Sequence, residues 1–293
     1  MTSTPLVAGD NADDNAGDNA EARLVPPRLG STADALRPMP YAPCTMHHAP
    51  CPMPLTTRPA MPCYFITGTD TDAGKTLVAS GLLALARRQA MTTLGLKPVA
   101  SGCESTALGL RNIDALTLQA QSTPAMAYEH INPFAYAPPI APHLAARYAG
   151  DRLTLDGLVH ALAPALAEPR DLVLVEGAGG WRVPLNDDED LAGLAERLAL
   201  PVILVVGLKL GCLNHARLSA EAIRADDRPI AGWVGNLIDP GFAADAGLFG
   251  DNIDHLEARL AAPCLGIVPR LDGQTPDARA EAAATHLTLP TGH

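Results

Sequence analysis

The feature that most constrains this chain is a glycine-rich turn that joins an apolar run to a helical pattern. Residues 63–67 are apolar and include two aromatics, which predicts a buried strand, and residues 77–88 have helical spacing. Gly74, Lys75 and Thr76 lie at the junction. Backbone N–H groups at a helix start point toward anionic oxygens, and the helix dipole favours negative charge there. The junction therefore predicts a phosphate-binding loop.

The side chains of this loop fit a nucleotide and its metal ion. Lys75 is placed to reach the β- and γ-phosphates, and the Thr76 hydroxyl is a ligand for Mg²⁺. Five residues separate Gly68 from Gly74, one more than in the usual motif, so the loop is a lengthened variant. The alternative is a glycine-rich turn that only caps a helix. We expect the nucleotide to be bound by Asp72, Ala73, Gly74, Lys75, Thr76 and Leu77.

After residue 62, apolar runs alternate with helical patterns. Strands are expected at residues 93–98, 171–176, 201–206, 230–237 and 264–268, and helices at residues 112–120, 155–166, 190–199, 214–225 and 251–260. Apolar strands separated by helices predict a three-layer α/β P-loop fold, with a mostly parallel sheet covered by helices on both faces. Ligands of such sheets bind beyond the carboxyl ends of the strands, so polar residues at those ends are the candidates for function.

Composition separates residues 1–60 from residues 61–293. The first part is rich in Asp, Asn, Ala and Gly and then in Pro, so we expect a disordered, low-complexity extension before one folded domain. Met61 precedes the first strand by two residues, which favours the hypothesis that the extension is dispensable. A cluster of two thiols and two imidazoles is either part of this tail or a metal site. Its members are Cys44, His47, His48 and Cys51.

Charge and cysteine usage exclude several classes of protein. The formal net charge of −11 argues against a nucleic-acid surface and against an anionic membrane face. No apolar run has the length of a membrane span, and the N-terminus lacks a basic and then apolar leader. The six cysteines are scattered, which favours free thiols in a reducing compartment over a disulfide framework. We therefore expect a cytoplasmic protein.

Three polar residues at the ends of expected elements are candidates for the reacting end of the nucleotide. Lys97 precedes a proline, which holds it extended at the end of its strand; the alternative is a solvated lysine. Asp114 lies early in a helix, where it either complements the dipole or binds Mg²⁺. Glu176 ends the most apolar strand, as a Walker-B-type acid does, or is only a loop acid. Thr76, Asp114 and Glu176 together would give Mg²⁺ hard oxygen ligands.

Further candidates follow other strands. Gly177, Ala178 and Gly179 allow a ligand to approach the backbone closely. Residues 209–215 open a helix, whose free N–H groups predict a site for a carboxylate or a phosphate; Cys212 within it is expected to pack at the helix start. The Asn236 amide matches an adenine edge, although Asn is also an ordinary turn residue.

Together these motifs resemble the dethiobiotin synthetase family. The resemblance runs in one order from about residue 61 to residue 285. It is carried by residues 68–76, 97–102, 109–114, 176–180, 206–215 and 232–236, and residues 268–271 resemble the family's nucleotide-base loop.

The resemblance implies an ATP- and Mg²⁺-dependent ligase of biotin synthesis. It would convert 7,8-diaminononanoate and CO₂ to dethiobiotin, ADP and phosphate, through a carbamate and a carbamic-phosphoric anhydride. Lys97 and Lys75 are then catalytic, and Thr71, Ser101 and Gly179 contact the diamine. Gly211, Cys212 and Leu213 of a second subunit would bind the substrate carboxylate, which implies a homodimer with its site at the interface. The implied contacts of the nucleotide base are Asn236, Leu237, Pro269, Arg270 and Leu271.

Two other classes share the lengthened loop. Dimeric switch ATPases that position other proteins usually carry an additional lysine near the start of the loop, whereas residues 67–71 contain none. Cobyrinate-type amidotransferases need an appended glutaminase domain, and the residues after 270 are too few to form one. The synthetase is therefore the favoured interpretation.

Overall fold

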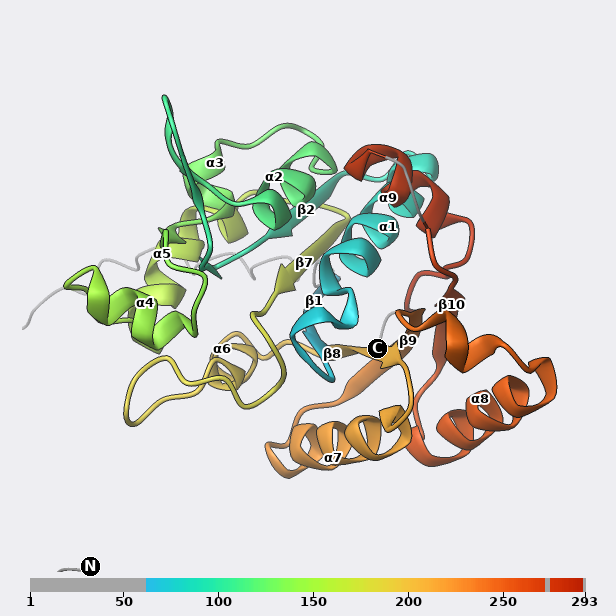
Figure 1. Cartoon of the computed structure of the whole chain (residues 1–293). Coiled ribbons are helices and arrows are strands. Elements are labelled where there is room, and N and C mark those ends of the chain that lie inside the picture. The colour runs from blue at the N-terminus through green and yellow to red at the C-terminus, as the bar shows by residue number, and fades with distance from the viewer. Residues whose placement is uncertain (1–61, 272–274, 292–293) are drawn as a thin grey trace, which may run out of the picture. The chain divides into compact units, whose positions relative to one another are not determined.

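The computed structural model describes residues 62–271 and 275–291 (Figure 1). The expected disorder of residues 1–60 and the possible metal cluster of Cys44, His47, His48 and Cys51 lie outside the described residues. The division of the chain at residue 60 therefore stays a prediction.

A six-stranded parallel sheet forms the centre of the described part. Its strands are β1 (Cys63–Gly68), β2 (Thr93–Leu96), β7 (Leu172–Glu176), β8 (Val202–Leu208), β9 (Ile230–Leu237) and β10 (Cys264–Val268). They lie in the order β10-β9-β8-β1-β7-β2, and all neighbouring pairs are parallel. The predicted α/β fold with a mostly parallel sheet is confirmed.

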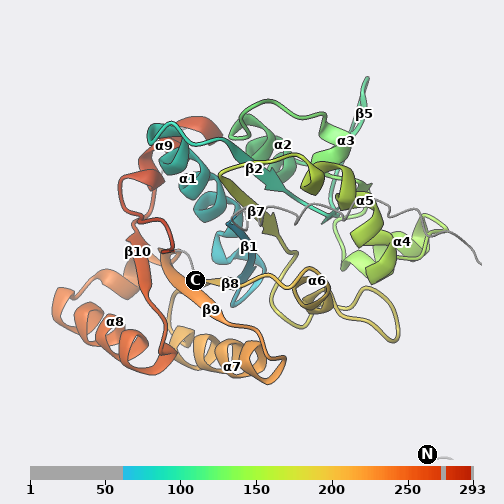
Figure 2. The same ribbon diagram turned by 180° about the vertical axis from the view of Figure 1, so that it is seen from behind.

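Helices cover both faces of this sheet (Figures 1 and 2). Tyr64 and Ile66 of β1 belong to one apolar cluster, and Phe65 between them belongs to the other. This alternation is expected because successive side chains of a strand point to opposite faces. The first cluster includes residues of α1 (Lys75–Arg88), α2 (Ile113–Ala120) and α9 (Pro276–Ala284); the second includes α5 (Leu155–Ala167), α6 (Ala192–Arg197), α7 (Cys212–Ala225) and α8 (Ala246–Leu260).

Shorter elements connect the core and were not predicted. They are η1 (Thr71–Ala73), β3 (Val99–Ala100), β4 (Glu104–Thr106), β5 (Gly109–Arg111), α3 (Tyr128–Ile131), β6 (Phe134–Ala135), α4 (Pro142–Tyr148) and η2 (Pro240–Ala243). The hairpin of β4 and β5 projects from the rest of the fold (Figure 2). Helix α8 begins earlier than the predicted residue 251, because the Asp245 side chain accepts a hydrogen bond from Leu248 N and caps it there.

Two sequence-based expectations concern cysteines and membranes. The four described cysteines, Cys63, Cys103, Cys212 and Cys264, are free thiols, as expected. Within residues 62–271 and 275–291, no helix combines the length and the apolar character needed to cross a membrane.

The topology brings three chemically important strand ends together. β7 pairs with β1 on one side and with β2 on the other, so the carboxyl ends of these strands are adjacent. β1 leads into the glycine-rich loop, β7 ends at Glu176, and β2 ends one residue before Lys97. The next residue, Pro98, has no N–H to continue the ladder.

Candidate active site

Asn236 of β9 holds the loop between β1 and α1 in place. Gly74 has φ +93°, in the left-handed region that glycine adopts without strain. Asn236 Nδ2 donates a hydrogen bond to Ala73 O at 2.9 Å. A Cβ atom at position 74 would lie 2.0 Å from the same Nδ2. Glycine is therefore required at position 74 both for the conformation and for the close approach of Asn236.

Lys75 lies buried in this loop among neutral partners. Its Nζ donates to the carbonyl oxygens of Asp70 and Thr71, each at 3.3 Å. Burial in the first place, and then the positive charge of Lys97, lower the pKa of Lys75 to about 8. Within residues 62–271 and 275–291 no carboxylate bonds directly to this ammonium group, so an anion bound in the loop would be its first direct negative partner.

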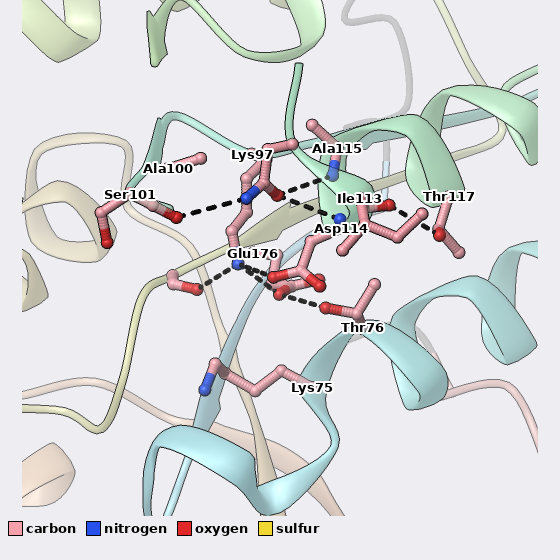
Figure 3. A network of polar contacts seen from close by, with 12 residues as sticks. Lys75, Thr76, Lys97, Ala100, Ser101, Ile113, Asp114, Ala115, Thr117 and Glu176 are labelled. Carbon is pink, nitrogen blue, oxygen red and sulfur yellow. Dashed lines mark hydrogen bonds and ion pairs between the residues drawn. The ribbon is translucent and has the colours of Figure 1, made fainter. Parts of the chain in front are cut away.

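Lys97 has the opposite surroundings (Figure 3). Its Nζ donates to Glu176 Oε1 at 2.6 Å, to Asp114 Oδ2 at 3.1 Å and to Gly177 O at 3.3 Å. The side chain of Glu176 is 0% exposed and that of Lys97 is 5% exposed. Burial by itself lowers the pKa of Lys97, but the two carboxylates outweigh it and the pKa is raised. For Asp114, burial raises the pKa, and the attraction of Lys97 outweighs it, so that the pKa is lowered.

Thr76 joins the same cluster and completes a set of oxygen ligands. Its hydroxyl donates to Glu176 Oε1 at 2.8 Å. Glu176 Oε2 is buried without a hydrogen-bond partner, which costs roughly 1–3 kcal/mol unless a ligand meets it. A hydroxyl, two carboxylates and an unpartnered carboxylate oxygen fit Mg²⁺. In the described ranges no group of three or more His, Cys, Asp or Glu side chains is placed to hold a metal ion, so Thr76 is needed to make up the set.

A cavity of about 450 Å³ opens over these groups. It brings together residues predicted for the phosphates, the metal ion and the diamine. The predicted residues that line it are Thr71, Asp72, Gly74, Lys75, Thr76, Leu77, Lys97, Ser101, Asp114, Glu176, Ala178 and Gly179. Their placement agrees with the sequence-based prediction of one site; the individual roles stay predictions.

The remaining candidate residues do not line this cavity. Ala73 is buried within the loop, and Gly177 contributes only the carbonyl that accepts from Lys97. Gly211, Cys212 and Leu213 lie at the start of α7, where Cys212 is 1% exposed and packs in the core, as expected. Asn236 and Leu237 end β9, and Pro269, Arg270 and Leu271 follow β10. A second subunit or a bound nucleotide would have to connect these residues to the cavity.

Other lining residues were missed by sequence reasoning. They are Ser80, Val99, Ala100, Asn112, Ile113, Thr117, Pro276 and Arg279. Asn112 had a detectable signal, since an Asn directly before a helix is a common N-cap. Its Oδ1 accepts from Asp114 N at 3.0 Å and from Ala115 N at 3.3 Å. Pro276 and Arg279 had no such signal because α9 reaches the site through tertiary packing, chiefly on α1.

The chain is similar to several known proteins. A family described as an AAA domain matches residues 63–278. The ATP-dependent dethiobiotin synthetase BioD of Chromohalobacter salexigens is 75% identical over 234 residues, which cover 78% of this chain and 99% of that protein. The protein of the same name from Pseudomonas aeruginosa is 56% identical over 78% of this chain and 97% of its own length. The MinC:MinD cell division protein complex of Aquifex aeolicus is 13% identical over 75% of this chain and 85% of that chain, with a TM-score of 0.47.

The parallel sheet and the loop at its centre define an α/β protein of the P-loop class. The AAA-domain family model matches residues 63–278, and the Chromohalobacter salexigens protein is 75% identical over 99% of its length, which is enough to assign a family. The chain belongs to the family of ATP-dependent dethiobiotin synthetases.

Proposed function

We propose that this protein converts 7,8-diaminononanoate, CO₂ and ATP to dethiobiotin, ADP and phosphate. The observation that carries the proposal is the contact of Lys97 with Glu176 and Asp114 directly beside the phosphate loop (Figure 3). In a chain of this family, that arrangement holds a fixed positive charge where two anions must react.

The reaction needs no covalent nucleophile from the protein. One amine of the substrate adds to CO₂ and releases a proton, which forms a carbamate. A carbamate oxygen then attacks the γ-phosphorus, and the bond to ADP breaks. The second amine attacks the carbonyl carbon and releases a proton, phosphate leaves, and the cyclic urea closes. Carbamate and triphosphate repel each other, so the protein has to offset their charge.

Lys75 and Lys97 offset this repulsion from fixed positions. In the proposed complex Lys75 bonds to the β- and γ-phosphates. The three N–H groups of Lys97 already donate to Glu176, Asp114 and Gly177, so Lys97 would stabilise the carbamate and the transferred phosphoryl group through its positive charge. Fixed charges in a site with little water stabilise a transition state more strongly than charges in bulk solvent. Glu176 and Asp114 keep Lys97 protonated and oriented while it does so.

Thr76, Asp114 and Glu176 are the residues that would hold Mg²⁺, with Glu176 Oε2 free to take part. When bound, the ion supplies further positive charge at the phosphates. Glu176 and Asp114 would then hold both Lys97 and the ion. The fit is supported by the hydroxyl and carboxylate oxygens already gathered in the cluster.

The proposal includes where the organic substrate and the second subunit bind. Thr71, Ser101 and Gly179 would contact the diamine from one side. The start of α7, Gly211 to Leu213, would bind the substrate carboxylate in a partner subunit of a homodimer. Asn236, Leu237 and residues 269–271 would contact the base of ATP, and the enzyme would be cytoplasmic.

Product analysis tests this function. The protein is incubated with the diamine, ¹³C-bicarbonate, ATP and Mg²⁺, and the products are separated and identified by mass spectrometry. We expect dethiobiotin labelled at its ureido carbon, with one ADP formed per product molecule. Omission of the diamine is the control. ADP formation that does not depend on the diamine, or that needs a protein partner, would contradict the proposal.

A further inference from the structure

The backbone of Lys97 is held by α3 instead of by the sheet. Because β2 ends at Leu96, no strand pairs with the next residue. Lys97 N donates to Ile131 O at 2.8 Å, and Lys97 O accepts from Asn132 Nδ2 at 2.7 Å. Both backbone polar groups of the lysine are therefore bonded to the end of α3. The position of the ammonium group depends on where that helix lies.

The same helix also holds the segment that carries Asp114. Tyr128 Oη donates to Asn132 Oδ1 at 3.0 Å and accepts from Asn112 N at 2.8 Å. Asn112 caps α2 at Asp114, and its Nδ2 donates to Ser101 O at 3.3 Å. A continuous series of hydrogen bonds thus runs from the backbone of Lys97 to the backbone of Asp114, with a branch to Ser101.

This series of hydrogen bonds is buried and fully used. Asn112, Tyr128 and Asn132 are 7%, 5% and 3% exposed. The Tyr128 hydroxyl donates one hydrogen bond and accepts one, and the Asn132 amide accepts one from Tyr128 and donates two, to Lys97 O and Phe134 O. The guanidinium group of Arg111 lies 4.1 Å from the centre of the Tyr128 ring, which packs the ring from outside. No member can be replaced by an apolar residue without leaving a buried partner unpaired.

We propose that Tyr128 and Asn132 are positioning residues, which fix the separation between Lys97 and Asp114. Neither side chain lines the cavity, so neither touches the reactants. They act through the backbone of the two segments that meet in the contact between Lys97 Nζ and Asp114 Oδ2. A displacement of about 1 Å in an active site can reduce turnover about 100-fold, so this distance has to be fixed. The inference deepens the proposed function, and its catalytic readout rests on that function.

The variant that tests it is Tyr128→Phe, with Tyr136→Phe as a matched control. Tyr136 is equally buried, at 5% exposed, and its hydroxyl donates to Asp151 Oδ2 at 2.6 Å, away from Lys97 and Asp114. Both substitutions remove one buried hydroxyl group and should lower Tm by similar amounts. We expect Tyr128→Phe alone to lower kcat about tenfold or more, within the 100-fold limit above, with KM for ATP little changed.

A second measurement does not need turnover. ADP binding is titrated by calorimetry at a series of Mg²⁺ concentrations, because displacement of Asp114 should weaken the metal site. We expect Tyr128→Phe, and not Tyr136→Phe, to need several-fold more Mg²⁺ for half of the full gain in ADP affinity. If the wild-type protein forms no dethiobiotin but this difference is found, the proposed function is wrong and the positioning role stands.

A double-mutant cycle separates positioning from general weakening. Tyr128→Phe and Asn132→Ala break the same series of hydrogen bonds, so the double variant should lose little more kcat than Asn132→Ala alone. The pair of Tyr136→Phe and Asn132→Ala should instead give independent effects. Equal losses of kcat in Tyr128→Phe and Tyr136→Phe, or strictly additive effects of Tyr128→Phe and Asn132→Ala, would overturn the inference.

Discussion

Two buried lysines, Lys75 and Lys97, line one cavity, and their pKa values are shifted in opposite directions. Lys97 bonds to the carboxylates of Glu176 and Asp114, and its pKa is raised. Lys75 bonds only to backbone carbonyl groups, and its pKa falls to about 8. The charge of Lys97 is thus balanced by direct contacts, whereas Lys75 is attracted by Glu176, Asp114 and Asp72 only over longer distances and pairs with no carboxylate among the described residues. Burial alone therefore does not decide the ionisation of a lysine; its partners do.

The largest expected effect comes from removing the balanced charge. Lys97→Met should lower turnover by orders of magnitude, because the attacking carbamate loses its fixed cation. It should also destabilise the fold by about 3–5 kcal/mol, since two carboxylates are left without their buried partner. Mg²⁺ should then raise the Tm of the variant more than that of the wild type. Turnover and Tm are measured with and without Mg²⁺, and near-normal turnover would contradict the mechanism.

Removing one balancing carboxylate should have the next largest effect. Glu176→Gln keeps the shape of the side chain but removes its charge, which weakens both the metal site and the contact with Lys97. We expect at least an about tenfold loss of Mg²⁺ affinity in the presence of ADP, measured by calorimetry. Glu281→Gln, in an exposed ion pair with Arg88, is the control. An unchanged dependence on Mg²⁺ would place the metal ligand elsewhere.

The lowered pKa of Lys75 should make ADP binding depend on pH. Above pH 8 the free protein loses the Lys75 proton and must take it up again when phosphates bind, so ADP affinity should fall by up to about tenfold per pH unit. Between pH 8 and the usual pKa of 10.5, the unfolded chain holds more protons at this lysine than the folded chain, so the destabilising effect of burying this group becomes smaller as pH rises. Calorimetry in buffers of different ionisation heat should detect proton uptake at pH 9 and none at pH 7. Equal uptake at both pH values would show that Lys75 is not the group responsible.

The smallest effect is expected at the exposed margin of the cavity. Arg279 lines the cavity from α9 but is open to solvent, so its charge is screened. Arg279→Ala should weaken nucleotide binding by about fivefold at most, and less at high salt. Arg217→Ala on α7, also exposed, is the control. The idea fails if both variants bind ADP equally well at low salt.

The long elements of the fold were predictable because their apolar patterns are continuous. The expected bounds of β9 and β10 agree with the structure, since both strands are apolar runs of ordinary length. The short elements α3 and α4 were not predictable, because a period cannot be read from so few residues. In α4, Pro142 occupies the first turn, where proline is tolerated.

The residues in and around the candidate site also include some that could be predicted from the sequence and some that could not. Lys97, Asp114 and Glu176 were predictable, because each is a charged residue at the end of a strand or the start of a helix. Tyr128 and Asn132 were not, because they bond to backbone atoms that the fold alone brings near. Asparagine is common in turns and loops, so Asn132 by itself does not indicate a function. Its partner, the carbonyl oxygen of Lys97, lies 35 positions away in the sequence, and no sequence pattern connects the two.

The contact between position 74 and Asn236 has an evolutionary consequence. A side chain at position 74 would collide with Asn236, since an added Cβ would lie 2.0 Å from Asn236 Nδ2. A smaller residue at position 236 would relieve that collision but not the backbone strain of position 74. A descendant of this chain would therefore keep glycine in the phosphate loop even if the facing residue on β9 changed.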